Sequence, residues 1–233
     1  MPALTQADID RLDGFFRMRA QAVQAIDEMI ASIQKTLSAT GHDKDTYIVF
    51  SGDNGYHMGD YSLHAGKQTA FDTDIHVPLI VIGPGVPAGK VVDAIAENID
   101  LCATFSELGG TPAPKTASGR SLVPFLKGAD ASDWRNVTLI EHHASNDPTD
   151  PDSEPGSGDP PTYEAIRLAN EVYVEYATGE TEYHDLTSDP DELTNTAKAL
   201  TPAHAAALHK TVTDIAACTD ADSCWKAQHY VSP

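Results

Sequence analysis

The apolar residues between positions 5 and 40 recur at a helical spacing. They are Ile9, Leu12, Phe16, Val23, Ile26, Ile30, Ile33 and Leu37. Steps of three, four or seven residues place such side chains on one side of an α-helix. Thr5 and Asp8 suit the N-terminus of this helix, and Gly41 suits its end. The pattern therefore predicts one long amphipathic helix over residues 5–40.

Short apolar runs follow this helix and alternate with a further helical pattern. Strands are expected at 46–50, at 76–85 ("HVPLIVIGPG") and at 136–143 ("NVTLIEHH"), with a helix at 98–110. The run at 76–85 is almost continuously apolar, which is typical of a strand covered on both faces. This alternation favours an α/β fold with a mainly parallel sheet flanked by helices.

The last third of the chain has a different pattern. Residues 145–161 are rich in Pro, Asp, Ser and Gly, so we expect an exposed loop without a core of its own. The runs "EVYVEY" (171–176) and "TEYHDL" (181–186) flank a short turn and predict an antiparallel hairpin. A short helix is expected to begin at Thr201 and Pro202. The expected parts are an α/β region at 1–144, the loop at 145–161, and a hairpin and helix at 162–233.

Composition narrows the possible partners. The 233 residues are 41% hydrophobic and 21% charged, and no apolar run is as long as a membrane span. The 35 acidic and 15 basic residues give a net charge of -20, which argues against nucleic acid or an anionic membrane as a partner. Any anionic substrate would therefore need cations placed locally in its site. Residues 1–14 have no basic head or apolar block, so no signal peptide is expected there.

The three cysteines suggest little chemistry. Cys102 lies in a helical apolar pattern and is expected to be a buried, inert thiol. Cys218 and Cys224 are six residues apart, where a disulfide is feasible but no more favoured than two free thiols. A disulfide there would indicate an oxidising, exported location.

The stretch "FSGDNGYHMGDYSLHAGK" (50–67) carries the main candidate chemistry. Asp53 and Asn54 directly follow a strand, and ligands of open α/β sheets bind beyond the carboxyl ends of the strands. A carboxylate and an amide carbonyl are hard oxygen ligands suited to Ca²⁺ or Mg²⁺. The alternative is plain turn chemistry, because Ser, Gly, Asp and Asn all favour turns.

The order of several segments resembles the C-terminal half of formylglycine-type sulfatases, which cleave aryl or amino-sugar sulfate esters. The residues that carry this resemblance are "TYIVFSGDNGYHMGDYSLHAGKQTAFDTDIHVPLIVIGPGV", "AENIDLCATFSELGGTPAP", "GRSLVPFLKG" and "EYHDLTSDPDELTNTA". The similarity covers nearly all of residues 10–200. It implies an alkaline-phosphatase-like α/β fold and a sulfuric ester hydrolase. A related phosphodiesterase or phosphonate hydrolase is an alternative within the same superfamily.

The resemblance also implies roles for single residues. Asp53 and Asn54 would be metal ligands, usually for Ca²⁺ or else another divalent cation such as Mg²⁺, and Lys67 would contact the sulfate ester. His57 is a further catalytic candidate because it lies three residues after Asn54; the alternative is a solvated loop residue. Asp72 and Asp74 are expected to cap the loop.

This sequence departs from the family at the nucleophile. The family uses Cys or Ser in a Cys/Ser-x-Pro-x-Arg motif, whereas the cysteines here read "CATFS", "CTDAD" and "CWKAQ". The paired aspartates that complete the metal site are also not found. We therefore expect a fragment or split product that needs an N-terminal sulfatase half, or a truncated, non-catalytic binding module. Family habit implies a secreted or periplasmic location.

Overall fold

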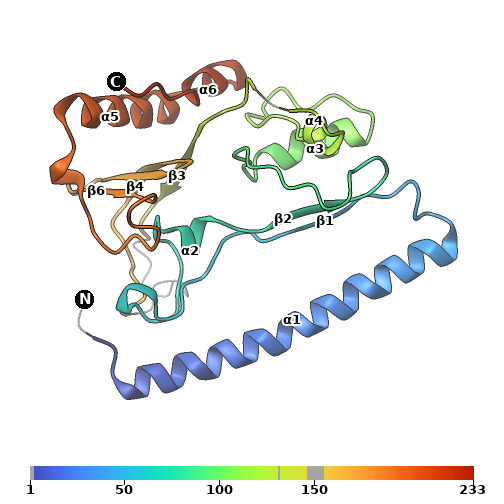
Figure 1. Ribbon diagram of the computed structural model, residues 1–233, viewed down its shortest axis with the longest axis horizontal. Helices are drawn as coiled ribbons and strands as arrows, with labels where there is room; N and C mark the ends of the chain where they lie inside the picture. Colours follow the sequence, from blue (N-terminus) through green and yellow to red (C-terminus); the bar gives the residue numbers. More distant parts are fainter. Residues whose placement is uncertain (1–2, 131, 146–154) are drawn as a thin grey trace. The chain divides into compact units, whose positions relative to one another are not determined.

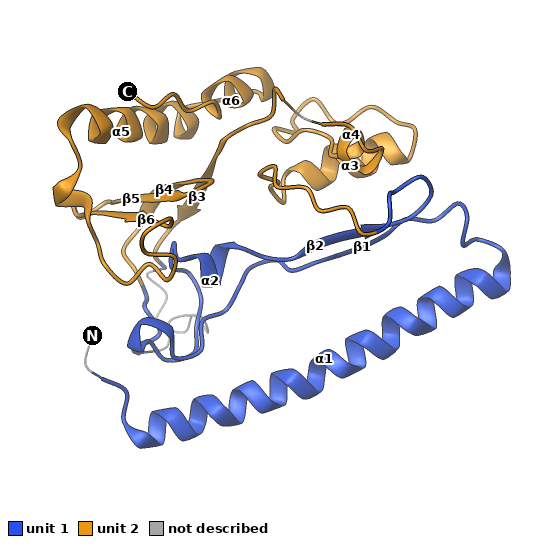
Figure 2. Ribbon diagram, in the orientation of Figure 1, with its two compact units in different colours: residues 1–88, 145–159 blue, residues 89–144, 160–233 orange. Residues whose placement is uncertain are grey.

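The computed structural model describes residues 3–130, 132–145 and 155–233. The chain forms two compact units, shown in Figure 2: unit 1 comprises 1–88 and 145–159, and unit 2 comprises 89–144 and 160–233. The sequence pattern instead predicts consecutive parts that divide at residues 144 and 161, whereas each observed unit is made of two separate segments. Most of the expected loop at 145–161 lies outside the described residues.

The predicted N-terminal helix is confirmed with its caps. Helix α1 spans Gln6–Thr40 (Figure 1). The Thr5 side chain accepts a hydrogen bond from the backbone of Asp8, whose carboxylate accepts one from Thr5 N, so the two form a capping box. Gly41 ends the helix with φ 78°, a left-handed conformation that glycine adopts without steric cost. The boundaries were thus readable from local signals.

A two-stranded ribbon follows α1 in unit 1. Strand β1 (Ile48–Ser51) pairs antiparallel with β2 (Leu79–Ile82), with Ile48 opposite Ile82. Between them lie only a 3₁₀ turn, η1 (Asp60–Ser62), and one helical turn, α2 (Asp72–Ile75). Parallel strands need a crossover of a dozen or more residues, usually a helix, whereas this loop returns the chain in the opposite direction. The prediction of a mainly parallel sheet is therefore wrong for the described residues, in which every strand pair is antiparallel.

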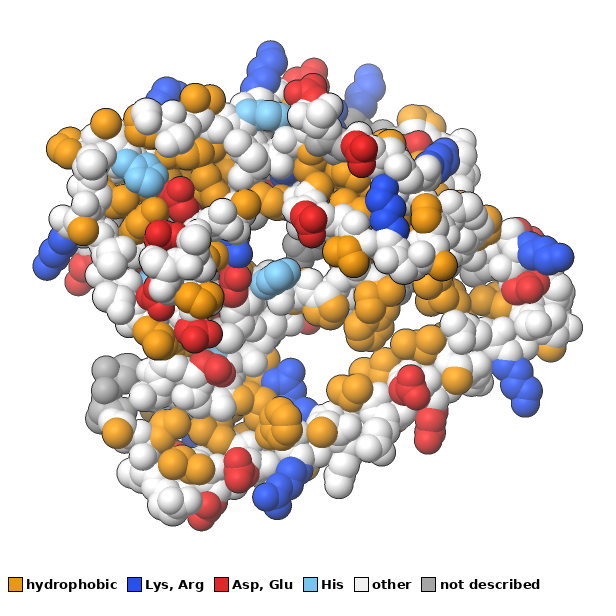
Figure 3. Space-filling view, in the orientation of Figure 1, with side chains coloured by type: hydrophobic (Ala, Val, Ile, Leu, Met, Phe, Trp, Pro, Cys, Tyr) orange, Lys and Arg blue, Asp and Glu red, His pale blue; other side chains and the backbone are white. Residues whose placement is uncertain are grey.

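Unit 1 leaves much apolar surface uncovered. The prediction that the run at 76–85 is covered on both faces is wrong, because Leu79, Ile80 and Ile82 are exposed. Of the residues in α1, only Leu12 is buried. Figure 3 shows apolar side chains exposed along this helix; the large ones are Ile9, Phe15, Phe16, Met18, Val23, Ile26, Met29 and Ile33.

Unit 2 contains a four-stranded antiparallel sheet in the order β3-β4-β5-β6. Its elements are α3 (Asp100–Leu108), α4 (Val123–Leu126), β3 (Val137–His142), β4 (Tyr163–Leu168), β5 (Glu171–Tyr176), β6 (Thr181–Asp185), η2 (Ala197–Ala199), α5 (Pro202–Ala216) and α6 (Ala221–Ala227). The predicted hairpin is confirmed as β5 and β6. The strand expected at 136–143 is β3, but it pairs with β4 in this sheet rather than with the ribbon.

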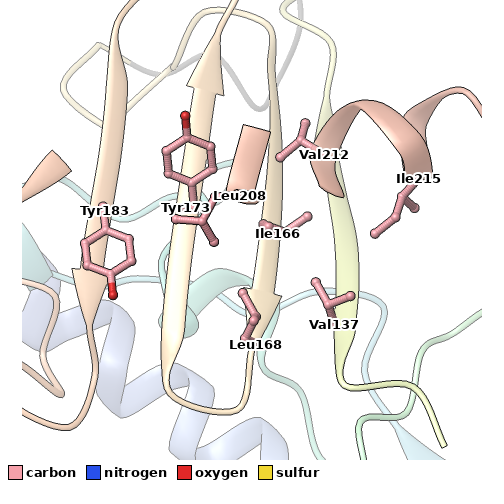
Figure 4. Close-up of a cluster of buried hydrophobic side chains, with 8 residues drawn as sticks. All are labelled: Val137, Ile166, Leu168, Tyr173, Tyr183, Leu208, Val212 and Ile215. Atoms are coloured by element: carbon pink, nitrogen blue, oxygen red, sulfur yellow. The ribbon is translucent and has the colours of Figure 1, made fainter. Parts of the chain in front are cut away.

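Helix α5 packs on this sheet and closes its core (Figure 4). The helix begins as expected, with Thr201 accepting a hydrogen bond from His204 N and Pro202 in its first turn. The buried cluster comprises Val137, Ile166, Leu168, Tyr173, Tyr183, Leu208, Val212 and Ile215. Among the described residues, this continuous apolar cluster lies in unit 2, whereas unit 1 buries only scattered apolar side chains such as Leu12 and Leu63.

A buried arginine fastens the start of α3 to the start of β3. Both Arg135 Nη atoms lie 2.7 Å from the carboxylate of Asp100, and Nη1 lies 2.8 Å from Glu97 Oε2. The guanidinium carbon is 5.1 Å from the ring centroid of Trp134 and 5.4 Å from that of Trp225. Burial raises the pKa of Glu97, an effect that the charge of Arg135 opposes. The side chains of both members of this bidentate pair are 0% exposed.

The cysteines differ partly from expectation. Cys218 and Cys224 form a disulfide, whereas Cys102 is exposed, so its predicted burial is wrong. Cys102 lies on α3, where the buried residues are Asp100, Ala103 and Thr104. Of the described helices, none has the length and apolar character needed to cross a membrane.

The disulfide gives a first prediction. Replacing both Cys218 and Cys224 by alanine is expected to lower the free energy of unfolding by about 2 kcal/mol, because a bridge over so short a loop removes little chain entropy. Calorimetry of the double variant, and of the reduced wild type, measures the change. Cys102→Ala is the control and should shift stability by no more than about 0.5 kcal/mol. Equal midpoints for the double variant and the control would contradict the expectation.

Candidate functional site

Asp53 and Asn54 lie just beyond the end of β1 and are both exposed. Asn54 N donates to Asp53 Oδ1 at 2.9 Å, and Asn54 Nδ2 donates to the carbonyl of Gly55 at 2.8 Å. The hydrogen bond from Nδ2 fixes the orientation of the Asn54 side-chain amide. Asp53 Oδ2 and Asn54 Oδ1 accept no hydrogen bond in these contacts, so both oxygens can bind a cation.

The donor set fits a hard divalent cation in kind but not in number. Carboxylate and amide oxygens are the ligands that Ca²⁺ and Mg²⁺ prefer, and Ca²⁺ takes about six to eight of them. Within the described residues, no group of three or more His, Cys, Asp or Glu side chains could hold a metal ion. Asp53 and Asn54 are therefore suited to be part of a cation site.

The glycine after this pair has no room for a side chain. A Cβ on Gly55 would lie 2.0 Å from the carbonyl oxygen of Thr73. Gly55 N donates to the Asp74 carbonyl at 2.7 Å, and Tyr56 N donates to the Thr73 carbonyl at 3.0 Å. The close approach explains why glycine follows Asp-Asn: the chain beyond the oxygen donors is fastened directly to α2.

Lys67 is linked to the same region through the backbone. His57 and Gly66 form an antiparallel bridge, with His57 N donating to Gly66 O at 2.9 Å and Gly66 N donating to His57 O at 3.1 Å. Lys67 directly follows Gly66, and Gly66 is paired with His57, which lies three residues after Asn54. The bridge therefore links the segment that contains Lys67 to the segment that follows Asp53 and Asn54, and the Lys67 side chain is partly exposed.

His57 is neither solvated nor at the surface. Its exposed fraction is 0%, and Nδ1 lies 2.9 and 3.0 Å from the two carboxylate oxygens of Asp74, itself 4% exposed. The predicted capping role of Asp74 was therefore incomplete, because its carboxylate is the partner of a buried histidine. Nothing local in the sequence pairs these residues, which are 17 positions apart.

Helix α1 holds the outer side of this loop. Leu12 is buried, and its Cδ1 lies 3.3 Å from where a Cβ on Gly59 would be. The Arg19 guanidinium lies 4.7 Å from the centroid of the Tyr56 ring, a cation–π contact. Asp8 Oδ1 is 3.4 Å from His64 Nε2, and hydrogen bonds from Thr5 lower the pKa of Asp8. The N-terminal half of α1 therefore packs on the site loop, residues 52–71, which connects β1 to α2 and contains Asp53, Asn54 and Lys67.

Two sequence profiles match the chain. The sulfatase profile matches residues 5–111, and the profile described as N-sulphoglucosamine sulphohydrolase, C-terminal, matches residues 59–217. The human protein N-acetylglucosamine-6-sulfatase is 35% identical over 221 residues, which cover 85% of this chain and 40% of that protein.

The chain also superposes on solved structures of other proteins. A phosphonate monoester hydrolase from Silicibacter pomeroyi superposes with a TM-score of 0.68 and 34% identity, over 82% of this chain and 38% of that one. A protein in complex with its substrate D-glucosamine-2-N,6-O-disulfate superposes with a TM-score of 0.66 and 26% identity, over 74% of this chain and 34% of that one. The chain thus spans about two-fifths or less of the length of the relatives it matches.

Proposed function

Because this chain belongs to the sulfatase family, we propose that it supplies part of the cation and sulfate site of a sulfuric ester hydrolase. The observation that carries the proposal is the single loop closure that joins Asp53 and Asn54 to Lys67 through the His57–Gly66 bridge. Asp53 and Asn54 are the proposed metal ligands, for Ca²⁺ or another divalent cation such as Mg²⁺. Lys67 is the proposed contact to the sulfuryl oxygens.

The chemistry explains why these groups belong together. Hydrolysis of a sulfate ester spreads negative charge over the sulfuryl oxygens and the departing ester oxygen. A bound divalent cation would neutralise part of that charge. Lys67 would supply a point charge on a flexible stem, fixed at its base by the bridge. In a protein with a net charge of -20, this local ammonium would also oppose the repulsion of an anionic substrate.

The site needs residues from a further polypeptide segment. Asp53 and Asn54 supply fewer oxygens than a calcium ion requires. No cysteine here lies in a Cys-x-Pro-x-Arg sequence, and Cys218 and Cys224 are joined to each other. We propose that an N-terminal sulfatase half supplies the nucleophile and the remaining carboxylates. Without it, the chain would be a non-catalytic binding module.

The uncovered surface of unit 1 supports such a partner. A ribbon of two strands is marginal by itself, and an apolar edge favours pairing with another chain. Side chains alternate between the faces of a strand, so Ile48, Phe50, Ile80 and Ile82 share one face of the ribbon. A hollow of about 450 Å³, lined in part by Leu37, Ile48 and Ile82, separates α1 from this ribbon. Burial of these apolar side chains would stabilise the complex.

The substrate is proposed to be a sulfate ester of an aryl group or a sugar. The human relative is named for an amino-sugar 6-sulfate, and a solved relative holds a disulfated glucosamine. The phosphonate monoester hydrolase from Silicibacter pomeroyi favours a second candidate, hydrolysis of phosphonate monoesters. The disulfide supports the proposal of an exported location, since such bridges persist in oxidising compartments.

Assays with and without the missing half test this proposal. The purified chain is expected to show no turnover of 4-nitrophenyl sulfate or of 4-nitrophenyl phenylphosphonate, with or without Ca²⁺. Co-expression with a formylglycine-bearing N-terminal sulfatase segment should produce calcium-dependent cleavage of the sulfate. Preferential cleavage of the phosphonate would favour the second candidate. Metal-dependent hydrolysis by the pure chain would contradict the need for a partner, and an inert but stable complex would indicate the binding module.

A further inference from the structure

The His57–Asp74 pair fixes both ends of a very short segment that contains Lys67. At one end, Gly66 is bridged to His57 by two backbone hydrogen bonds of 2.9 and 3.1 Å. At the other end, Thr69 donates to Asp74 Oδ2 from its backbone N at 2.9 Å and from its hydroxyl at 2.6 Å. Lys67 and Gln68 therefore lie between two anchored residues, Gly66 and Thr69. Gly66 is held by His57, which contacts the buried Asp74 carboxylate, and Thr69 contacts that carboxylate directly.

The direction of the hydrogen bond between His57 and Asp74 follows from the chemistry of the pair. A carboxylate only accepts hydrogen bonds, so His57 Nδ1 carries the proton that it donates to Asp74. The backbone N of His57 also donates to Asp74 Oδ1, at 3.1 Å. With the two bonds from Thr69, the Asp74 carboxylate collects four donor groups from two residues. Such a network is costly to disturb because each buried group depends on the others.

The backbone between the anchors has an uncommon conformation. Gln68 has φ 88°, a left-handed value that non-glycine residues seldom adopt and that costs about 1–3 kcal/mol. Such a conformation persists only where its surroundings fix it from both sides. The two anchors on Gly66 and Thr69 do this, and the direction in which Lys67 leaves the backbone depends on them.

The ring of His57 also fills the space beside Gly66. A Cβ on Gly66 would lie 3.0 Å from His57 Nε2 and 2.6 Å from the Cβ of Ser157. Nε2 is buried and meets no hydrogen-bond partner within the described residues. The ring therefore acts on the loop through Nδ1 and through its shape, with no observed role for its second nitrogen.

We propose that His57 is a positioning residue that, together with Asp74, holds Lys67 in place for the sulfuryl group. This inference rests on the proposed function of Lys67. It gives His57 a role other than direct contact with the substrate. A displacement of about 1 Å can reduce the rate of a well-oriented reaction by about 100-fold, so a lysine on a strained segment needs such a support.

Sulfate titration of the isotope-labelled chain tests the proposal. Inorganic sulfate at low ionic strength is expected to shift the resonances of Lys67 in the wild-type protein. His57→Ala should weaken this response about tenfold and move the Gln68 amide signal. His57→Asn should restore most of the affinity, because the asparagine amide can donate to Asp74 as Nδ1 does. Asp74→Asn provides a second route should His57→Ala fail to fold, and is expected to weaken sulfate binding similarly.

The outcomes separate the two proposals. No response of Lys67 in the wild type would overturn the assigned role of Lys67, and with it this inference. A wild-type response that His57→Ala leaves unchanged would overturn only the positioning role. If His57→Asn bound sulfate as weakly as His57→Ala, the role of His57 would be packing in the core and not positioning of Lys67. Rescue by asparagine supports positioning, since a merely space-filling ring would not be replaced by an amide.

Discussion

Replacing Lys67 by alanine is expected to reduce sulfate ester hydrolysis by the complemented enzyme about 100- to 1,000-fold. Groups that stabilise charge in the transition state typically have effects of this size when removed. Asp53→Ala should cause a similar loss and should raise the calcium concentration needed for half-maximal activity. The measurement is kcat/KM for 4-nitrophenyl sulfate across a calcium titration, with the N-terminal half held in excess.

A matched control separates the site from the global charge. Lys115 is an exposed lysine of unit 2 on the loop between α3 and α4, whereas Asp53, Asn54 and Lys67 belong to unit 1. Lys115→Ala changes the net charge as Lys67→Ala does, and should leave kcat/KM within about twofold, as expected for a surface change outside the site. Equal losses for the two lysine variants would assign the effect to overall charge and remove Lys67 from the site.

The second large effect is expected at Arg135. Arg135→Ala should destabilise unit 2 by about 3–5 kcal/mol, because the buried Asp100 side chain would lose its charge partner. The change would also remove the guanidinium that packs against both Trp134 and Trp225. Chemical denaturation, followed by the fluorescence of these tryptophans, measures the loss.

Arg135→Met, combined with Asp100→Asn and Glu97→Gln, should recover part of the stability, because no buried charge is then left unpaired and an amide oxygen at position 100 can still accept from Arg120 N. The control is Lys210→Ala, which breaks the exposed ion pair of Lys210 with Asp214 and should cost less than about 1 kcal/mol. An Arg135→Ala variant as stable as this control would show that the buried pair contributes nothing.

Features set by neighbouring residues could be predicted from the sequence. The ends of α1 follow from Thr5, Asp8 and Gly41, and the start of α5 follows from Thr201 and Pro202. The hairpin of β5 and β6 follows from two alternating runs and the turn between them. Each of these signals acts within a few residues, where hydrogen bonds and side-chain spacing decide the outcome.

Features that depend on distant pairing could not be predicted. Strand β4 was not expected, although it joins β3 to the hairpin and completes the sheet. The direction of the β1–β2 pairing depends on a loop that turns back without a long helix. The partners His57 and Asp74, and likewise Arg135 and Asp100, are 17 and 35 residues apart. The sequence singled out Asp53, Asn54, His57 and Lys67 as candidates, but it did not predict that His57 pairs with Asp74.

The order of the two units along the chain restricts how they can be separated. The polypeptide passes from unit 1 to unit 2 after residue 88, returns after residue 144, and passes again after residue 159. A single cut after residue 88 would separate residues 1–88 of unit 1 from a piece that holds all of unit 2 together with residues 145–159 of unit 1. No single cut divides the chain into two complete units, so removal of either whole unit by simple truncation would also remove residues of the other.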